Sequence, residues 1–212
     1  MTFEGFPERA LDFYEGLAAD NTKAYWTDHR ATYDRDVKAP MEALLARLEP
    51  EFGPAKFFRP YRDVRFSKDK TPYKEHAGAV VHGDATLYVQ FGADGLYVAG
   101  GYWRVETDQA LRLRAAIADD VSGPQLVALL DRLVGEGWSI GGERYKRVPK
   151  PYDAAHPRAD LLHHKSLTAS QPLEPGEWLH TSECADRVAG LWRALLPLAA
   201  WLRTRVGTTR TT

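Results

Sequence analysis

One stretch decides the fold class, Leu87-Tyr88-Val89-Gln90-Phe91-Gly92-Ala93-Asp94-Gly95-Leu96-Tyr97-Val98. Two runs rich in β-branched, aromatic and other apolar residues flank Asp94-Gly95, a dipeptide typical of the tight turn in a β-hairpin. Residues 77–81, just before the hairpin, form another short apolar run that predicts a strand. Because consecutive strands joined by short turns pair antiparallel, the central region predicts a mainly antiparallel sheet.

Three further segments outside the hairpin predict strands. Residues 62–67 alternate, with Val64 and Phe66 on one face and polar or charged side chains on the other. Residues 138–140 and 166–170 are short β-prone runs much later in the chain. We expect each of these segments to form a strand.

Apolar residues at helical spacing flank the strand-rich region on both sides. Four residues of the first such stripe are Phe6, Ala10, Phe13 and Leu17. Helical patterns return after Thr107 and again in a long segment from about residue 183 to residue 205. Helices first, strands in the middle and mixed elements last are typical of an α+β protein. We therefore predict one α+β domain over residues 1–212, with its mainly antiparallel sheet packed against N-terminal, middle and C-terminal helices.

The composition limits the classes of protein that fit this chain. With 212 residues, 44% of them hydrophobic, and a net charge of -1, the chain can build a sizeable core. Its single cysteine, Cys184, excludes an internal disulfide and a multi-cysteine zinc site, and it suits a reducing compartment. The most apolar stretch, residues 191–202, is interrupted by Arg193 and Pro197 and is too short to span a bilayer. We expect a soluble, cytoplasmic protein that makes no use of a membrane.

Histidines and overall charge restrict the ligands further. None of the seven histidines has the helical spacing that places two imidazoles on one metal ion. We therefore expect no metal site and no bound cofactor. A pI near 6.7 disfavours a general nucleic-acid binder, since such domains usually carry a strong basic excess.

The densest block of charge lies between residues 56 and 74. Its seven cations are Lys56, Arg59, Arg62, Arg65, Lys68, Lys70 and Lys74. Only Asp63 and Asp69 accompany them, which leaves a local excess of five positive charges in a chain of net charge -1. Such an excess predicts a site for an anionic ligand or partner.

Residues 62–74 read R-D-V-R-F-S-K-D-K-T-P-Y-K, and this run resembles the R-D-x-R-F-S-K-D-K-x-P-Y-K hallmark of a widespread microbial family described only as a conserved domain of unknown function. Four more segments are similar to the family's pattern: Asn21-Thr-Lys-Ala-Tyr-Trp, Gly100-Gly101-Tyr-Trp, residues 146–152 and residues 164–166. One departure is Pro151, where the family usually has glycine. The resemblance implies a single compact α+β domain and no particular reaction.

We predict that the basic block binds a small anionic molecule bearing phosphate or carboxylate. The ligand-binding candidates are Arg62, Arg65, Ser67, Lys68, Lys70, Tyr73 and Lys74, with Lys146 and Lys165 from a second basic group. Arg65 and Ser67 share one face of the expected strand, so a guanidinium fork and a hydroxyl can converge on one oxyanion, with Arg65 as the main clamp. If the site is catalytic, Asp63 or Asp69 is the candidate base and His76 the candidate proton carrier.

Two other interpretations of the block remain open. In the first, an exposed ridge of its lysines docks an acidic protein or a nucleic-acid backbone. In the second, its charges form an internal salt-bridge network that holds the loop in place. A concave site that buries Arg65 and Tyr73 favours a small molecule over the docking surface, whereas the salt-bridge network requires every charge in the run to be paired.

Overall fold

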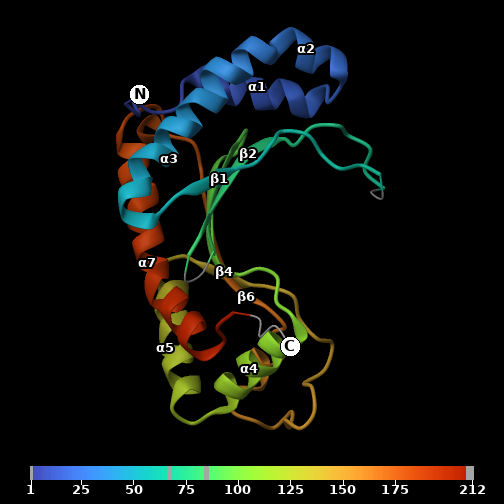
Figure 1. Cartoon of the computed structure of the whole chain (residues 1–212), viewed down its shortest axis with the longest axis vertical. Helices are drawn as coiled ribbons and strands as arrows, with labels where there is room; N and C mark the ends of the chain where they lie inside the picture. Colours follow the sequence, from blue (N-terminus) through green and yellow to red (C-terminus); the bar gives the residue numbers. More distant parts are fainter. Residues whose placement is uncertain (1, 66–67, 84–85, 209–212) are drawn as a thin grey trace. The chain divides into compact units, whose positions relative to one another are not determined.

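A computed structural model of the chain describes residues 2–65, 68–83 and 86–208. Within these residues, six strands form one sheet: β1 (Ala55–Phe57), β2 (His76–His82), β3 (Thr86–Gly92), β4 (Gly95–Tyr102), β5 (Ser139–Gly141) and β6 (Leu167–Leu173). Their order across the sheet is β1-β2-β3-β4-β6-β5, and neighbouring strands run antiparallel (Figure 1). The predicted central antiparallel sheet is confirmed.

Helices precede, interrupt and follow these strands. They are α1 (Glu8–Ala19), α2 (Lys23–Thr32), the π-helical η1 (Tyr33–Lys38), α3 (Ala39–Phe52), α4 (Thr107–Ala118), α5 (Ser122–Gly135), α6 (Ala159–Leu162), the 3-10 helix η2 (Glu177–His180) and α7 (Glu183–Arg205). Among them, α3 contacts β1 and α5 contacts β5. The α+β class, with N-terminal, middle and C-terminal helices on the sheet, is therefore confirmed.

Residues at the helix and strand ends explain several of these boundaries. The side chain of Thr22 caps α2 by accepting a hydrogen bond from the backbone N–H of Tyr25 at 3.2 Å. Gly53 follows α3 with a φ of 88°, a left-handed conformation that favours glycine. Gly95 at the β3–β4 turn has a φ of 92° as well, so the Asp94-Gly95 signal marks the turn where the sequence predicts it.

The strand expected over residues 62–67 is not present as predicted. Residues 62–65 are not in a strand, while Phe66 and Ser67 lie outside the described residues. The edge strand is β1 instead, and beyond it Tyr61 forms an isolated antiparallel bridge with Tyr73. Pro60 and Pro72 flank this bridge and lack the N–H that a longer ladder requires, which explains why the alternation does not produce a strand.

The chain divides into two compact units. Unit 1 comprises Met1–His82, Tyr88–Val98 and Pro172–Leu191. Unit 2 comprises Gly83–Leu87, Ala99–Gln171 and Trp192–Thr212. That these units unfold together as a single domain stays a prediction.

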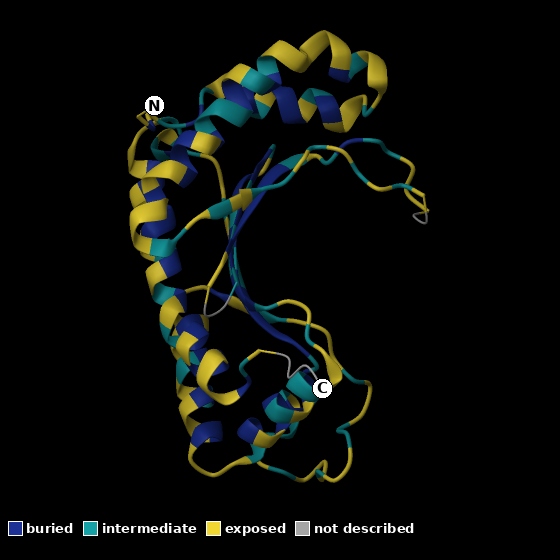
Figure 2. Ribbon diagram, viewed as in Figure 1, coloured by how far each residue is buried: buried dark blue, intermediate teal, exposed yellow. Residues whose placement is uncertain are grey.

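Each unit has a hydrophobic core of its own (Figure 2). In unit 1 the ring of Phe6 stacks on Phe91 with 4.2 Å between their centroids. In unit 2 the indole N–H of Trp201 donates to the backbone oxygen of Ser122 at 3.1 Å. Because both partners in each contact are almost completely buried, these aromatic groups contribute strongly to each core.

The helices of the described part of the chain do not include a membrane-spanning candidate. None is both long enough and apolar enough to cross a bilayer.

Candidate functional site

The basic block forms a loop that is closed by a short two-stranded ribbon in unit 1. The backbone N–H of Arg62 donates to the oxygen of Pro72 at 2.9 Å, and the N–H of Lys74 donates to the oxygen of Pro60 at 2.8 Å. Together with the Tyr61–Tyr73 bridge, these bonds pair residues 60–62 with residues 72–74. Residues 63–65 and 68–71 extend beyond this ribbon (Figure 1).

Helix α2 and the residue before its cap hold the ribbon in place. The side-chain amide of Asn21 accepts a hydrogen bond from the N–H of Tyr73 at 3.1 Å and donates to its carbonyl oxygen at 3.0 Å. The indole of Trp26 stacks on the ring of Tyr73, with 4.4 Å between centroids and 8° between planes. Tyr73, a predicted ligand-binding residue, is buried in this contact.

Ion pairs and hydrogen bonds organise the loop beyond the ribbon. Arg62 pairs with Asp69 and donates to the hydroxyl of Thr71 at 2.6 Å. Arg65 pairs with Asp63 through two bonds of 2.9 and 2.7 Å, a bidentate arrangement. Two of the predicted ligand-binding residues, Arg62 and Arg65, therefore already have carboxylate partners.

These contacts affect the protonation of both loop carboxylates. Hydrogen bonds from the side chain and backbone of Arg65 lower the pKa of Asp63. Hydrogen bonds from the backbone and hydroxyl of Thr71, followed by the charge of Arg62, lower the pKa of Asp69. Both carboxylates are therefore held in the ionised form, and both serve to orient the loop.

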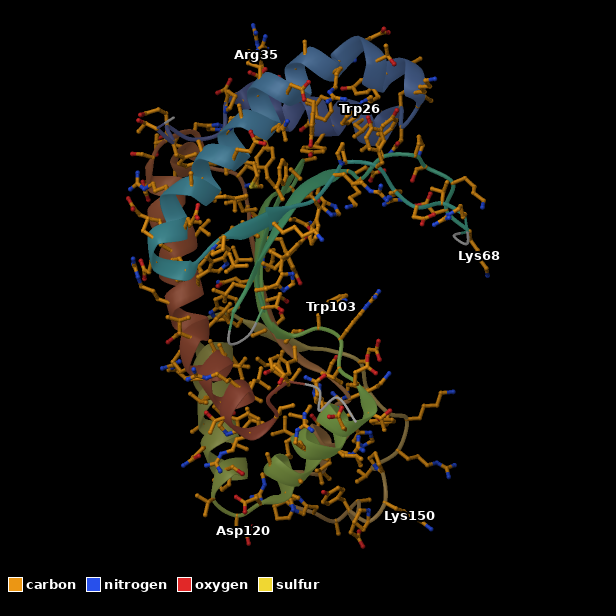
Figure 3. All side chains as sticks on the ribbon, in the orientation of Figure 1. Trp26, Arg35, Lys68, Trp103, Asp120 and Lys150 are labelled. Carbon is orange, nitrogen blue, oxygen red and sulfur yellow. The ribbon has the colours of Figure 1, made fainter. Side chains whose placement is uncertain are left out.

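The far part of the loop exposes its cations to solvent. Arg65 is 77% exposed, and Lys68 and Lys70 are exposed as well. The ammonium of Lys70 donates to the backbone oxygen of Val64 at 2.9 Å. Figure 3 shows Lys68 extending away from the ribbon. Ser67, the predicted partner of Arg65, lies outside the described residues.

The base of the loop carries a second, more enclosed group of cations. Because side chains alternate along paired strands, Arg62 and Lys74 lie on the face opposite to Tyr61 and Tyr73. The ammonium of Lys74 lies 5.1 Å from the ring centroid of Phe58. This face is the one turned away from the α2 contact.

The cations at the base of the loop change the pKa values of their neighbours. Burial lowers the pKa of Lys74, and the positive charges of Arg59 and Arg62 lower it further. Burial also lowers the pKa of His76, with smaller contributions from Lys74 and Arg62. The fold thus holds like charges close together, which costs stability unless an anion joins them.

The same face continues across the sheet of unit 1. The ring of Phe58 lies 6.5 Å from that of Tyr88, and Tyr88 meets Tyr97 edge to face at 6.4 Å. The hydroxyl of Tyr88 donates to the side-chain oxygen of Gln90 at 2.8 Å. A Cβ on Gly78 would lie 2.6 Å from that hydroxyl, so glycine leaves the space that Tyr88 occupies.

We call this surface the basic sheet face. It comprises seven half-buried residues, all in unit 1: Phe58, Arg62, Lys74, His76, Tyr88, Gln90 and Tyr97. A cavity of about 370 Å³ at the β3–β4 turn is lined by Gln90 and Tyr97 and also by Tyr14 and Ala18 of α1, and its lining does not include Arg62 or Lys74. Cations, hydrogen-bonding groups and flat rings therefore share one surface.

Sequence reasoning did not identify Phe58, Tyr88 or Gln90 as parts of a site. A signal for two of them exists in the period of β3, whose buried residues Val89 and Phe91 alternate with Tyr88 and Gln90. The alternation assigns Tyr88 and Gln90 to one face, although it does not show that cations share this face.

The two remaining ligand-binding candidates, Lys146 and Lys165, belong to unit 2. The ammonium of Lys165 pairs with Glu143 at 2.8 Å, and Lys146 is exposed. Neither belongs to the compact unit that carries the basic sheet face.

Metal ligands and a reactive thiol do not gather in the described residues. Within residues 2–65, 68–83 and 86–208, no group of three or more His, Cys, Asp and Glu side chains could hold a metal ion. Cys184 is buried, and burial raises the pKa of its thiol to about 12.

Comparison with known proteins places the chain in a family. It matches no curated protein and no solved structure. A family model described as a conserved hypothetical protein, DUF2461, matches residues 9–201. Since this match covers most of the chain, the protein belongs to the DUF2461 family of conserved hypothetical proteins.

Proposed function

We propose that this protein binds a small anionic molecule on the basic sheet face, with Lys74 and Arg62 taking its phosphate or carboxylate group. One observation carries the proposal: Lys74 is half-buried and has cations as its strongest electrostatic neighbours. Within the described residues, no carboxylate lies within ion-pair distance of its ammonium. A bound anion supplies the missing negative charge.

This assignment shifts the centre of the predicted site from the exposed part of the loop to its base. Arg65 has a bidentate partner in Asp63 and is largely exposed, whereas Lys74 is partly shielded from water. An anion gains more from a partly desolvated cation, because the local dielectric constant is lower there. We therefore assign the main contact to Lys74 and a supporting one to Arg62.

The rest of the face suggests what the ligand carries besides its charge. Phe58, Tyr88 and Tyr97 present rings, while the Tyr88–Gln90 pair presents hydrogen-bonding groups. Small-molecule sites combine apolar walls with a few placed polar groups in the same way. We infer a ligand with a flat or apolar part next to its anionic group.

If the bound molecule reacts on this face, His76 is the best-placed proton acceptor. Its lowered pKa keeps the imidazole neutral near pH 7, whereas Asp63 and Asp69 are held by ion pairs within the loop. A neutral imidazole beside two cations can accept a proton from an acidic group of the ligand.

A second candidate function rests on a different observation. Arg65, Lys68 and Lys70 are exposed on a loop whose base is fixed by Asn21 and Trp26. Such a surface can dock an acidic protein or a nucleic-acid backbone. In this alternative, the exposed part of the loop makes the contact and its base supports it.

Thermal unfolding distinguishes the two candidate functions. The parent, Lys74→Met and Lys68→Met are compared in sodium phosphate and in sodium chloride of equal ionic strength. Phosphate should raise the thermal unfolding midpoint of the parent. At a concentration a hundredfold above the dissociation constant, the unfolding free energy should increase by about 2.7 kcal/mol. Lys74→Met should lose this effect, and the matched control Lys68→Met should retain it. If phosphate still raises the midpoint of Lys74→Met, the small-molecule site is contradicted. If the parent binds polyglutamate and Lys68→Met does not, the exposed part of the loop docks an acidic partner.

A further inference from the structure

Unit 2 contains a buried arginine without a hydrogen-bond acceptor. Arg114, on α4, is only 6% exposed, yet its Nε and Nη1 atoms are enclosed and have no partner among the described residues. The contact that the structure records for its guanidinium is with the ring of Tyr145, whose centroid lies 5.0 Å away. Buried guanidinium groups normally bind a carboxylate or backbone oxygens, so this one requires an explanation.

Other arginines of unit 2 show that the fold can supply acceptors. Arg112, on the same helix, donates to Asp108 at 2.7 Å and to the backbone oxygen of Thr208 at 2.7 Å. Arg158 donates to backbone oxygens at the C-terminal end of α4, the nearest at 2.6 Å. The enclosed nitrogens of Arg114 therefore differ from the guanidinium groups of Arg112 and Arg158. Gln171 Oε1 is another enclosed atom of unit 2 without a hydrogen-bond partner among the described residues.

The position of Arg114 on its helix makes the exception clearer. Ala110, Leu113 and Ile117 are buried residues of α4, and Arg114 falls on their stripe at helical spacing. An apolar residue is expected there. An arginine at a core position with unsatisfied donors breaks the local pattern, and such departures are expected at functional or strained sites.

The segment around Tyr145 adds a rigid wall. The N–H of Tyr145 donates to the oxygen of His163 at 2.7 Å, and the ring nitrogen Nδ1 of His163 lies 2.9 Å from the oxygen of Tyr145. This pairing fixes the backbone of Tyr145 and so restricts the ring that lies against Arg114. Guanidinium groups stacked on a fixed ring present their N–H groups in a defined plane.

The charges near Tyr145 in the sequence favour an anion. Lys146, Arg147 and Lys150 follow Tyr145 and are exposed (Figure 3 labels Lys150). Two acidic residues that lie near Tyr145 or near its pairing partner His163 in the sequence are in ion pairs. Glu143 pairs with Lys165 at 2.8 Å, and Asp160 pairs with Arg144 at 2.5 Å. Exposed cations raise the local concentration of small anions.

We propose that Arg114 anchors a second ligand site, within unit 2, for the carboxylate or phosphate group of a small molecule. The planar guanidinium donates to two oxygens of that group, and Tyr145 holds the guanidinium plane. Lys146, Arg147 and Lys150 attract the ligand from solvent. The site uses only residues of unit 2 and does not depend on the basic sheet face.

The test is thermal unfolding in sodium phosphate, sodium acetate and sodium chloride at equal ionic strength. It is done on an Arg62→Met/Lys74→Met background, so that the first site does not contribute. On this background we compare Arg114→Met and Arg114→Lys with Arg132→Met, a matched control that removes an exposed positive charge from α5 of the same unit.

Phosphate or acetate should raise the midpoint of the background protein and of the Arg132→Met control. Arg114→Met should abolish this rise, and Arg114→Lys should weaken the apparent affinity by about tenfold or more, because a point charge replaces the planar fork. In chloride, Arg114→Met should be at least as stable as the background, since it removes an unpaired buried charge. The response to phosphate against acetate identifies the ligand group.

Two outcomes overturn the proposal. In one, neither anion stabilises the background protein. In the other, an anion does so equally in Arg114→Lys. Arg114 is then a core residue whose role is to pack on Tyr145. If Arg114→Met fails to fold, the comparison of Arg114→Lys with Arg132→Met decides the question.

Discussion

Asn21 binds the backbone of Tyr73 through both ends of its side-chain amide, accepting from the N–H at 3.1 Å and donating to the carbonyl oxygen at 3.0 Å. The amide thereby imitates a neighbouring strand, because it satisfies both polar groups of one residue as a sheet ladder does. This contact joins the start of α2 to the closed end of the basic loop, 52 positions away.

Removing this amide should destabilise the protein. Asn21→Ala leaves the two backbone groups of Tyr73 without their partner, which should cost about 1–3 kcal/mol of unfolding free energy in a denaturant titration. Thr22→Ala, which removes only the adjacent helix cap, should cost about 1 kcal/mol. If Asn21→Ala lowers the unfolding free energy by less than Thr22→Ala does, the contact between Asn21 and the Tyr73 backbone does not hold the ribbon in place.

Gly78 and Tyr88 should be energetically coupled. Gly78→Ala places a Cβ 2.6 Å from the Tyr88 hydroxyl, so the ring must move and its bond to Gln90 should break. Tyr88→Phe removes the clashing oxygen and should recover part of the loss. A double-mutant cycle by chemical denaturation should give a coupling energy of about 0.5 kcal/mol or more. If the two substitutions are additive, the Tyr88 ring moves aside without loss of stability.

The stability of the protein should depend on the protonation of His76. Burial lowers the pKa of His76 in the folded state below its ordinary value of 6.5, so the unfolded chain binds the proton more tightly. The neutral imidazole therefore contributes stability that is present above pH 6.5 and is lost as the pH falls through the folded pKa.

His76→Asn should flatten this part of the pH profile in urea titrations between about pH 5 and pH 8. His164 is also buried and also has a lowered pKa, so His164→Asn serves as a comparison that removes the other contribution. Nuclear magnetic resonance of the His76 ring should give a pKa below 6.5 without ligand and a higher one in phosphate. A free-state pKa above 6.5 contradicts the burial of His76 and the smaller contribution of the nearby cations.

Cys184 should react only when the protein opens. Its side chain is buried, and burial raises the thiol pKa to about 12, so little thiolate forms in the native state. Labelling with a disulfide reagent near pH 8 should be slow in the native protein and fast in urea. Labelling of the native protein at the rate of a free thiol would show that the start of α7 is not packed as described.

The hairpin of β3 and β4 is predictable because its information is local. Asp94-Gly95 supplies the turn, and the flanking runs supply two strands of matching length. The helical stripes are predictable for the same reason, since a period of 3.6 residues is visible within each segment. Together these signals suffice for the α+β class.

The basic loop is less predictable because its geometry depends on distant residues. Asn21 and Trp26 decide which faces of residues 60–62 and 72–74 point to α2, and no local pattern contains that choice. The cations of the block were recognisable by composition, whereas their division into an exposed group and a group enclosed at the base was not. Arg114 is an intermediate case, since its place on the stripe of α4 is visible but its missing acceptor is not.

The way in which Asn21 and Trp26 hold Tyr73 has an evolutionary consequence. Neither contact uses a cation of the loop, so the residues that anchor the ribbon differ from those that carry charge. Substitutions between residues 63 and 71 can therefore change the charge of the exposed part of the loop while leaving the anchor intact. A chain that keeps Asn21, Trp26 and Tyr73 can therefore present a loop of different charge on the same anchored ribbon.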